Sequence, residues 1–263
     1  MIRPVIPFVL VCSCFSAVRA QTTTSAPQAL PILQRAYAAM AGTTAVNDVT
    51  LTGTAQRIAG SDDETGTVTY KAIAGSSRLD LNLSKGTRTE IRVLGGDGPG
   101  GNWIGPDGVV HEIANHNLFS EPTWFPIFTL SNLISSANSV LTYIGPETKD
   151  GVSVIHIQST QQQESNLSAS IAVLLQHLSQ MDMYLDASTL LPVALDYNTH
   201  PDNNAALDIP VEFRFSDYRQ AGSLTLPFHV QHYLNGSLFV DVQFQSASVN
   251  TGLSSSSSIF TIQ

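Results

Sequence analysis

Apolar and polar residues alternate with a period of two along most of the chain. The alternation is clearest between Met181 and Phe244, in runs such as the one from Val211 to Ser216. Because successive side chains of a β-strand point to opposite faces, this period predicts strands. Each predicted strand has one apolar and one polar face, which favours an antiparallel sheet with one face covered and the other in water. We therefore predict a mainly β fold.

An Asn-Gly pair after Leu234 predicts a hairpin turn. With a two-residue loop, Leu234 would pair with Ser237 and Val230 would face Asp241. With a three-residue loop, Val230 would face Val240, and the apolar side chains would be buried together, because opposed residues share a face. We therefore predict the three-residue loop, with its glycine at positive φ in a bulged turn. The inward set would be Leu226, Phe228, Val230, Val240, Val242 and Phe244, and the outward charges would be Asp182, Asp186, Glu212, Arg214 and Asp241.

The first half of the chain shows the same alternation in four runs between Val49 and Val93. The charges of the last two runs are expected to form a cross-strand lattice on the wet face, each pair contributing about 0–1 kcal/mol. These charges are Arg78, Asp80, Arg88, Glu90 and Arg92. The glycine-rich segment 95–101 predicts a loop, because a phosphate cradle would need a lysine and a helix after it.

Three segments depart from the strand period. Residues 27–42 and 168–180 repeat apolar residues at intervals of three and four, which predicts amphipathic helices, the second capped by Ser168. Residues 117–137 are the most aromatic segment and predict a loop followed by a short helix from about Phe125. We interpret this segment as core packing; the alternative is a lid over an apolar cavity.

The composition excludes two classes of partner. Only 13% of the 263 residues are charged, and the net charge is −9. Binding to nucleic acid or to an anionic membrane surface needs patches of Lys and Arg, and the sequence has no basic run. We find no repeat of fixed period and no second domain boundary, so residues 21–263 are predicted to form one domain.

The N-terminus has the features of a secretory signal. Arg3 begins a mostly apolar run that ends in Val18-Arg19-Ala20, a small-x-small cleavage site. The run is shorter than the roughly 20 residues that a membrane span needs. We predict that residues 1–20 are a signal peptide cleaved after Ala20, with export to the periplasm and secretion as the second choice. Both cysteines lie in the signal, namely Cys12 and Cys14. The mature chain would therefore have no disulfide and no thiolate site.

The histidines and acids form no recognisable catalytic or metal-binding motif. His229 and His232 lie three apart on a predicted strand and should point to opposite faces. Asp182 and Asp186 would lie about 13 Å apart along a strand, outside the roughly 5–9.5 Å of glycosidase carboxylates. No Gly-x-Ser-x-Gly elbow is present. We predict no catalytic residue, no metal and no cofactor. Three further histidines lie on separate elements and could come together only in the folded protein: His156, His177 and His200.

Six runs of the sequence follow one another in a distinctive order. They are SRLDLNL, RTEIRVLGGDG and NWIGPDGVVHEI, then KDGVSVIHI, MDMYLDASTLLPVALDY and VEFRFSDYRQAGSLTLPFHVQHYLNGSLFVDVQF. In this order they resemble the bacterial lipoprotein-localisation carriers, the LolA-like periplasmic proteins, over most of residues 28–260. The resemblance implies a curved antiparallel sheet, an incomplete barrel of about eleven strands, with two or three short helices on its concave face.

The same resemblance implies a site. In the family the cavity binds acyl chains or lipoproteins under a lid helix, which only residues 117–137 could supply here. Arg57 is the candidate for the arginine that fastens the lid, because it shares the parity of Val49 and Leu51.

We therefore predict a non-catalytic periplasmic carrier for a hydrophobic ligand, such as a lipid, an acyl chain or a lipoprotein. It would be soluble after signal cleavage, would contact envelope membrane proteins only transiently, and would bind no nucleic acid. One alternative is an interaction or sensor module with the same fold and no cavity of about 300 Å³ or more; another is a secreted hydrolase. The predicted ligand-binding residues are Trp103, Trp124, Phe125, Phe128, Leu133, Ile134, Ile171, Leu174, Phe228 and Val230.

Overall fold

A computed structural model describes most of the chain, namely residues 26–95, 98–120, 124–162, 167–254 and 258–262. The predicted signal peptide, its cleavage site and both cysteines lie outside the described residues. No helix in these ranges has the length and apolar character needed to cross a membrane.

In the described part of the chain, thirteen strands make up the sheet. The first six are β1 (Asp48–Ala59), β2 (Asp62–Ile73), β3 (Ser76–Leu83), β4 (Gly86–Gly95), β5 (Gly98–Ile104) and β6 (Val110–Glu112). The other seven are β7 (Ser139–Lys149), β8 (Val152–Gln161), β9 (Met181–Asp186), β10 (Pro192–Thr199), β11 (Ile209–Ala221), β12 (Leu224–Leu234) and β13 (Ser237–Val249). The helices are α1 (Ala29–Ala41), α2 (Pro126–Ser135) and α3 (Ala169–Leu178), with short 3-10 turns η1 (Asn115–Asn117) and η2 (Ser258–Phe260).

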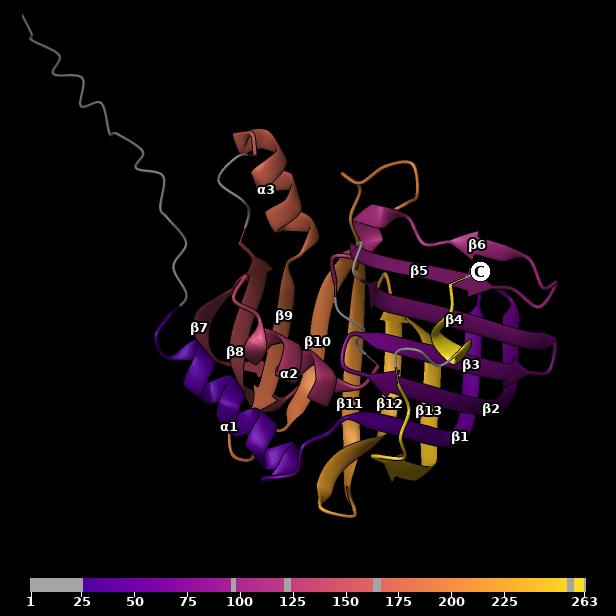
Figure 1. Ribbon diagram of the computed structural model, residues 1–263, viewed down its shortest axis with the longest axis horizontal. Coiled ribbons are helices and arrows are strands. Elements are labelled where there is room, and N and C mark those ends of the chain that lie inside the picture. The colour runs from indigo at the N-terminus through magenta and orange to yellow at the C-terminus, as the bar shows by residue number, and fades with distance from the viewer. Residues whose placement is uncertain (1–25, 96–97, 121–123, 163–166, 255–257, 263) are drawn as a thin grey trace, which may run out of the picture.

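All thirteen strands belong to one antiparallel sheet. Its order is β6-β5-β4-β3-β2-β1-β13-β12-β11-β10-β9-β8-β7, so β1 and β13 join the two halves of the chain. The outer strands β6 and β7 do not pair with each other, and the sheet curves so strongly that β3–β5 run at a steep angle to β11–β13 (Figure 1). The predicted incomplete barrel is therefore confirmed.

The strand number is higher than the predicted eleven. Much of the glycine-rich segment expected as a loop is strand instead, because β5 begins at Gly98 and pairs with β4. Close packing is one reason for its glycines. A Cβ atom at Gly101 would lie 2.9 Å from the Cδ1 atom of Ile113 and 3.0 Å from the carbonyl oxygen of Ile91.

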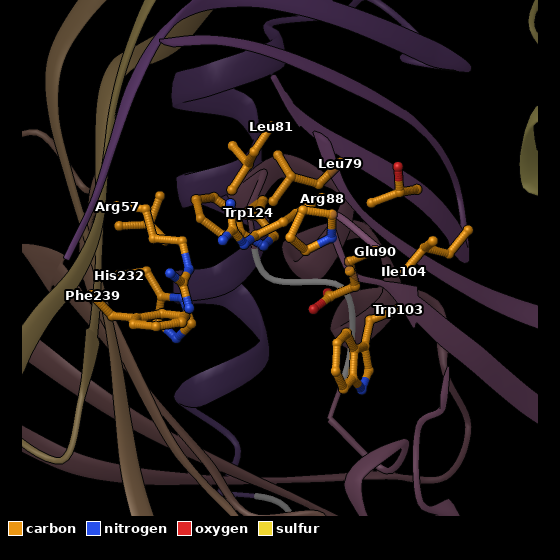
Figure 2. Close-up of a pocket in the computed structure, with 14 residues that line it drawn as sticks. Arg57, Leu79, Leu81, Arg88, Glu90, Trp103, Ile104, Trp124, His232 and Phe239 are labelled. Carbon is orange, nitrogen blue, oxygen red and sulfur yellow. The ribbon is translucent and has the colours of Figure 1, made fainter. Parts of the chain in front are cut away.

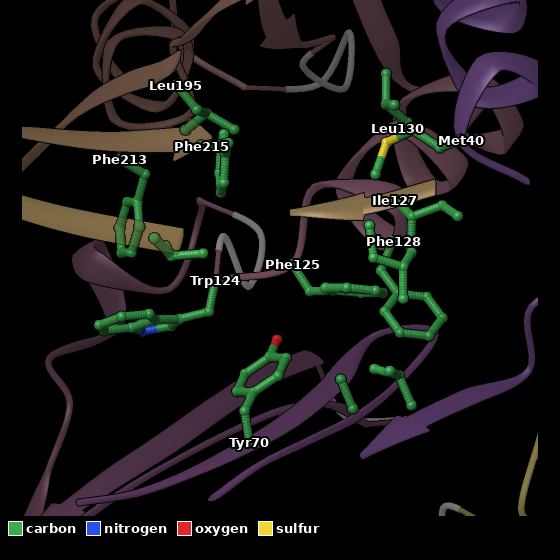
Figure 3. Packing of buried hydrophobic residues seen from close by; sticks show 14 of the residues in the cluster. Met40, Tyr70, Trp124, Phe125, Ile127, Phe128, Leu130, Leu195, Phe213 and Phe215 are labelled. Atoms are coloured by element: carbon green, nitrogen blue, oxygen red, sulfur yellow. The ribbon is translucent and has the colours of Figure 1, made fainter. Parts of the chain in front are cut away.

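Of the three α-helices among the described residues, α1 and α2 cover the concave face of the sheet. The apolar stripe of α1 is buried there, including Ile32, Leu33 and Met40. Helix α2 is apolar nearly all round, which is typical of a buried helix, and Phe128, Leu130 and Leu133 are among its buried residues. Trp124 and Phe125, just before α2, insert between the halves of the sheet (Figure 3). These positions agree with the interpretation of residues 117–137 as core.

Helix α3 differs from this pattern. It begins as predicted, with Ser168 accepting a hydrogen bond from the Ile171 backbone N–H at 3.4 Å. However, Leu178 is its one buried residue. Ile171, Val173 and Leu174 are 48%, 66% and 41% exposed. The helix extends away from the body of the sheet (Figure 1).

The β12–β13 hairpin has a different turn from the predicted one. Leu234 pairs directly with Ser237, so the loop has two residues and the three-residue prediction is wrong. An irregularity between His232 and Tyr233 then shifts the register by one residue, and Val230 faces Val242. The bulge does what the longer loop was expected to do: it keeps the apolar residues of both strands on the inner face. Gly236 has the predicted positive φ, 74°.

Charged residues of the second half lie on the convex face, as predicted. Lys149 Nζ is 2.6 Å from an Asp196 oxygen and 3.0 Å from a Glu212 oxygen. His156 Nε2 is 2.8 Å from Asp182 Oδ1. These cross-strand pairs satisfy polar groups on the face that the helices do not cover.

The predicted lattice on β3 and β4 is wrong, because the two strands present their charges to opposite faces. Leu79 pairs with Glu90 and Leu81 with Arg88, whereas Asp80 pairs with Thr89. Opposed residues share a face. Arg88 and Glu90 therefore lie on the concave face beside apolar residues, and this placement creates the polar part of the candidate site.

Candidate ligand-binding site

The concave face holds a pocket of about 340 Å³ between the two halves of the sheet. Arg57, His232 and Phe239 approach it from one side and Leu79, Leu81 and Trp103 from the other, with Trp124 between them (Figure 2). Most of these side chains are apolar. The pocket thus has the size and character of a small-molecule site, which is usually an apolar hollow of roughly 300–1,000 Å³.

A buried carboxylate holds two arginines at the wall of the pocket. Glu64 on β2 is fully buried, and its Oε1 lies 3.2 Å from Arg57 Nη1 and 2.8 Å from Arg88 Nη2. Arg88 Nη1 also donates to Glu64 Oε2 at 2.9 Å, which makes that pair bidentate. The guanidinium of Arg57 lies 5.0 Å from the centre of the Phe239 ring. Arg57, the expected lid-fastening arginine, is therefore bonded to the sheet.

A second ion pair lines the same region. Arg92 Nε donates to Glu90 Oε1 at 2.9 Å, and Arg92 Nη1 donates to the Asn117 carbonyl oxygen at 3.1 Å. Glu90 is also part of the pocket wall. Because each acid has an arginine partner, the pocket offers apolar surface and paired charges.

His232 is the unusual polar residue of the pocket. Neither of its ring nitrogens is exposed to solvent or has a hydrogen-bond partner among the described residues. The ring stacks on Phe213, with centroids 4.5 Å apart, and meets the rings of Trp124 and Phe239 edge-on at 5.5 Å. Burial lowers the pKa of His232 to about 4, because the charged imidazolium would lose its hydration.

We expect acid to destabilise the protein through His232. The pKa is about 6.5 in an unfolded chain and about 4 in the folded protein. Between these values the unfolded state binds more protons, so the free energy of unfolding rises with pH. Above about pH 6.5 His232 is neutral in both states and does not lower the free energy of unfolding. As the pH drops toward 4, the free energy of unfolding falls, by about 3 kcal/mol at most.

Urea unfolding across this pH window measures the effect. The variant His232→Phe removes the titrating group but keeps a ring of similar shape, so its stability should depend less on pH than that of the wild type. Equal losses of stability in the two proteins would show that His232 is not responsible.

The predicted binding residues fall into three groups. Trp103 and Trp124 line the pocket. Phe125, Phe128, Leu133, Phe228 and Val230 are buried in the core, and Ile134 is partly buried against it. Ile171 and Leu174 are exposed on α3. The fold also brings to the pocket residues that the sequence interpretation missed: Leu79, Leu81, Arg88, Glu90, His232 and Phe239.

A serine, a histidine and an aspartate form a row on the convex face, outside the pocket. Ser216 Oγ lies 3.0 Å from His229 Nδ1, and His229 Nε2 lies 3.0 Å from Asp241 Oδ1. In a serine hydrolase the nitrogens have the opposite roles, with Nε2 toward the serine and Nδ1 toward the acid. The row is therefore a surface hydrogen-bond chain across three strands, and it gives the hydrolase alternative no support.

Sequence comparison finds no relative: no protein-family model matches the chain, and no curated protein matches it. Solved structures do match. A domain assigned to outer membrane lipoprotein sorting, from Vibrio parahaemolyticus, aligns with a TM-score of 0.53 at 12% identity, covering 87% of this chain and 94% of that one. A DUF1329 family protein from Desulfovibrio piger gives 0.53 at 12% identity, covering 86% and 93%.

A LolA superfamily protein from Nitrosomonas europaea gives a TM-score of 0.51 at 9% identity, covering 87% of this chain and 96% of that chain. At identities this low, the structural alignments show a common fold alone. The shared architecture is the one that the sequence resemblance implied. The protein therefore has the fold of the LolA superfamily.

Proposed function

We propose that this protein binds a hydrophobic ligand in the concave pocket and carries it without chemical change. The observation that supports this most is the pocket itself, which measures about 340 Å³ and is lined mainly by leucine, isoleucine, valine and aromatic side chains. A lipid, a free acyl chain or the acyl group of a lipoprotein fits this description.

Binding would come from removing apolar surface from water. Each Å² of apolar surface buried contributes about 25 cal/mol, and Leu79, Leu81, Trp103, Trp124 and Phe239 supply the surface on the protein side. The arginines are bonded to Glu64 and Glu90, so a ligand would not need a charged group to satisfy them. We therefore propose that the acyl part of the ligand provides most of the affinity.

The fold comparison supports the same proposal. One of the aligned structures is a domain assigned to outer membrane lipoprotein sorting. Together with the predicted signal peptide, cleaved after Ala20, it supports a site of action in the periplasm, with transient contacts to proteins of the envelope membranes.

A filled interaction or sensor module is the second candidate. Its core would leave no space between sheet and helices, whereas the pocket here exceeds the roughly 300 Å³ of typical ligand sites. The open volume favours the carrier.

Filling the pocket is expected to weaken ligand binding strongly. Leu81 is buried on β3 with its side chain at the pocket. The variant Leu81→Trp would occupy the open space, and its affinity for a fluorescent fatty acid should fall by about tenfold or more, a loss of at least about 1.4 kcal/mol. A fluorescence titration of delipidated protein measures this.

Leu207→Trp is the matched control, because Leu207 is 54% exposed on the loop between β10 and β11. It should bind like the wild type. The proposal is wrong if delipidated wild-type protein takes up no fatty acid, or if Leu81→Trp binds it as well as the control does.

A further inference from the structure

Two histidines and an aspartate from distant elements meet at one end of the half-barrel. His177 lies in the last turn of α3, His200 follows β10, and Asp208 precedes β11. Asp208 Oδ1 is 2.9 Å from His177 Nε2 and 3.2 Å from His200 Nε2. The three ligand atoms lie within 4.8 Å of one another. None of the three residues lines the concave pocket.

The side chain of Asn117 determines which nitrogen of His200 carries its proton. Asn117 Nδ2 donates to the His200 carbonyl oxygen at 2.8 Å, and Asn117 Oδ1 accepts from the His200 backbone N–H at 2.8 Å. Exchanging the amide oxygen and nitrogen would lose both bonds, so the orientation of Asn117 is fixed. Its Oδ1 also lies 3.3 Å from His200 Nδ1. The proton of the neutral ring therefore belongs on Nδ1.

This tautomer leaves a lone pair on His200 Nε2 directed at the Asp208 carboxylate. Two acceptors 3.2 Å apart need a cation between them. A second proton on the ring would bury a positive charge, because the His200 side chain is only 1% exposed. A bound metal ion satisfies both acceptors and also the nearby His177.

We propose that His177, His200 and Asp208 bind a divalent transition-metal ion, with Zn²⁺ as the best match. Zinc takes histidine nitrogens and carboxylate oxygens at about 2.0–2.2 Å, so tetrahedral ligand atoms lie about 3.3 Å apart. The present separations of 2.9 and 3.2 Å are close to that value. Asn117 would be the outer partner that holds the His200 ring in its ligand tautomer.

His116 is a neighbour and not a ligand. Its ring meets that of His200 edge-on with centroids 5.9 Å apart, and its Nε2 donates to the Pro201 carbonyl oxygen at 3.1 Å. The ligand set therefore consists of three protein atoms, and water would complete the coordination.

The metal would fasten α3 to the sheet. Leu178 is the one buried side chain of this helix, so few apolar contacts hold it in place. His177 precedes Leu178 and is bonded to Asp208 next to β11. A metal bond at this position joins the helix, the β10–β11 loop and, through Asn117, the η1 turn.

Zinc titration of the untagged full chain, stripped with a chelator and followed by calorimetry at neutral pH, tests the proposal. We expect one Zn²⁺ per chain and a higher melting temperature with zinc. His177→Ala and Asp208→Asn should each weaken binding by about tenfold or more, and Asn117→Ala by about 10–100-fold. The His177 and Asp208 side chains are 40% and 41% exposed, so these two variants should fold.

His229→Ala is the control, because His229 pairs with a single acid, Asp241, and should not affect the zinc site. Co²⁺ in place of Zn²⁺ should give an absorption spectrum that His177→Ala loses and His229→Ala keeps. The proposal is overturned if the wild type binds no zinc, or if His177→Ala and Asp208→Asn bind it as tightly as His229→Ala. Fatty-acid binding in the concave pocket is a separate readout, so failure of one proposal leaves the other intact.

Discussion

Replacing Glu64 with alanine is expected to destabilise the protein by about 3–5 kcal/mol. Glu64 is fully buried and accepts from Arg57, from both nitrogens of the Arg88 fork and, at 3.3 Å, from the Lys85 backbone N–H. Its removal leaves two guanidinium groups side by side, both largely shielded from water, with no counter-charge between them. Breaking a buried ion pair from one side costs far more than the pair contributes as a whole, because the remaining charge is still desolvated.

Asp62→Ala provides a matched comparison in the same hairpin. Asp62 is bonded to Lys85, but both side chains are exposed, at 41% and 55%. An exposed pair of this kind contributes little to stability, because water screens the two charges. The free energies of unfolding of the two variants, measured with urea, should therefore differ by several kcal/mol. Similar losses for both would mean that Glu64 is not the internal counter-charge of the pocket.

The second large effect is expected for Phe125→Ala, which should cost about 3–5 kcal/mol of stability. Phe125 is fully buried at the start of α2, with ring centroids 6.4 Å from Tyr70 and 5.7 Å from Phe128 (Figure 3). Truncation would open a cavity between α2 and the sheet, and the neighbouring rings can refill it only in part.

This variant also separates the two interpretations of residues 117–137. A core segment predicts a large loss of stability, whereas a movable lid predicts a stable protein with altered ligand uptake. Val173→Ala on the exposed face of α3 is the comparison and should change the free energy of unfolding by less than about 0.5 kcal/mol. If Phe125→Ala unfolds at the same urea concentration as Val173→Ala, α2 is not part of the core.

The sequence predicted the elements of the fold better than their pairing. Period-two alternation located the strands, and Ser168 marked the start of α3. At the β12–β13 hairpin, however, a three-residue loop and a two-residue loop with a bulge both bury Val230 with apolar partners. The hydrophobic pattern is satisfied equally by the two solutions, so it cannot reveal where the extra residue is accommodated.

The charged part of the pocket was missed for a related reason. The alternation within β4 places Arg88 and Glu90 on its polar face, and a polar face alone indicates water. Only the pairing with β3 shows that these charges share the concave face with Leu79 and Leu81. A prediction of a two-residue turn at Ser84-Lys85 would have placed Arg88 opposite Leu81.

The histidine cluster had no signal in the sequence. His177, His200 and Asp208 belong to three elements, and the spacing of the first two fits no metal motif. The curvature of the sheet and the length of the β10–β11 loop bring them together, and alternation carries no information about either. A site of this kind is visible only in three dimensions.

Native mass spectrometry of the protein purified from a periplasm tests the carrier function most directly. We predict that the wild type carries an adduct with the mass of a lipid or fatty acid, which solvent extraction releases and Leu81→Trp lacks. A wild-type protein that is free of lipid, and that stays free after incubation with periplasmic membrane extract, would contradict the proposed function.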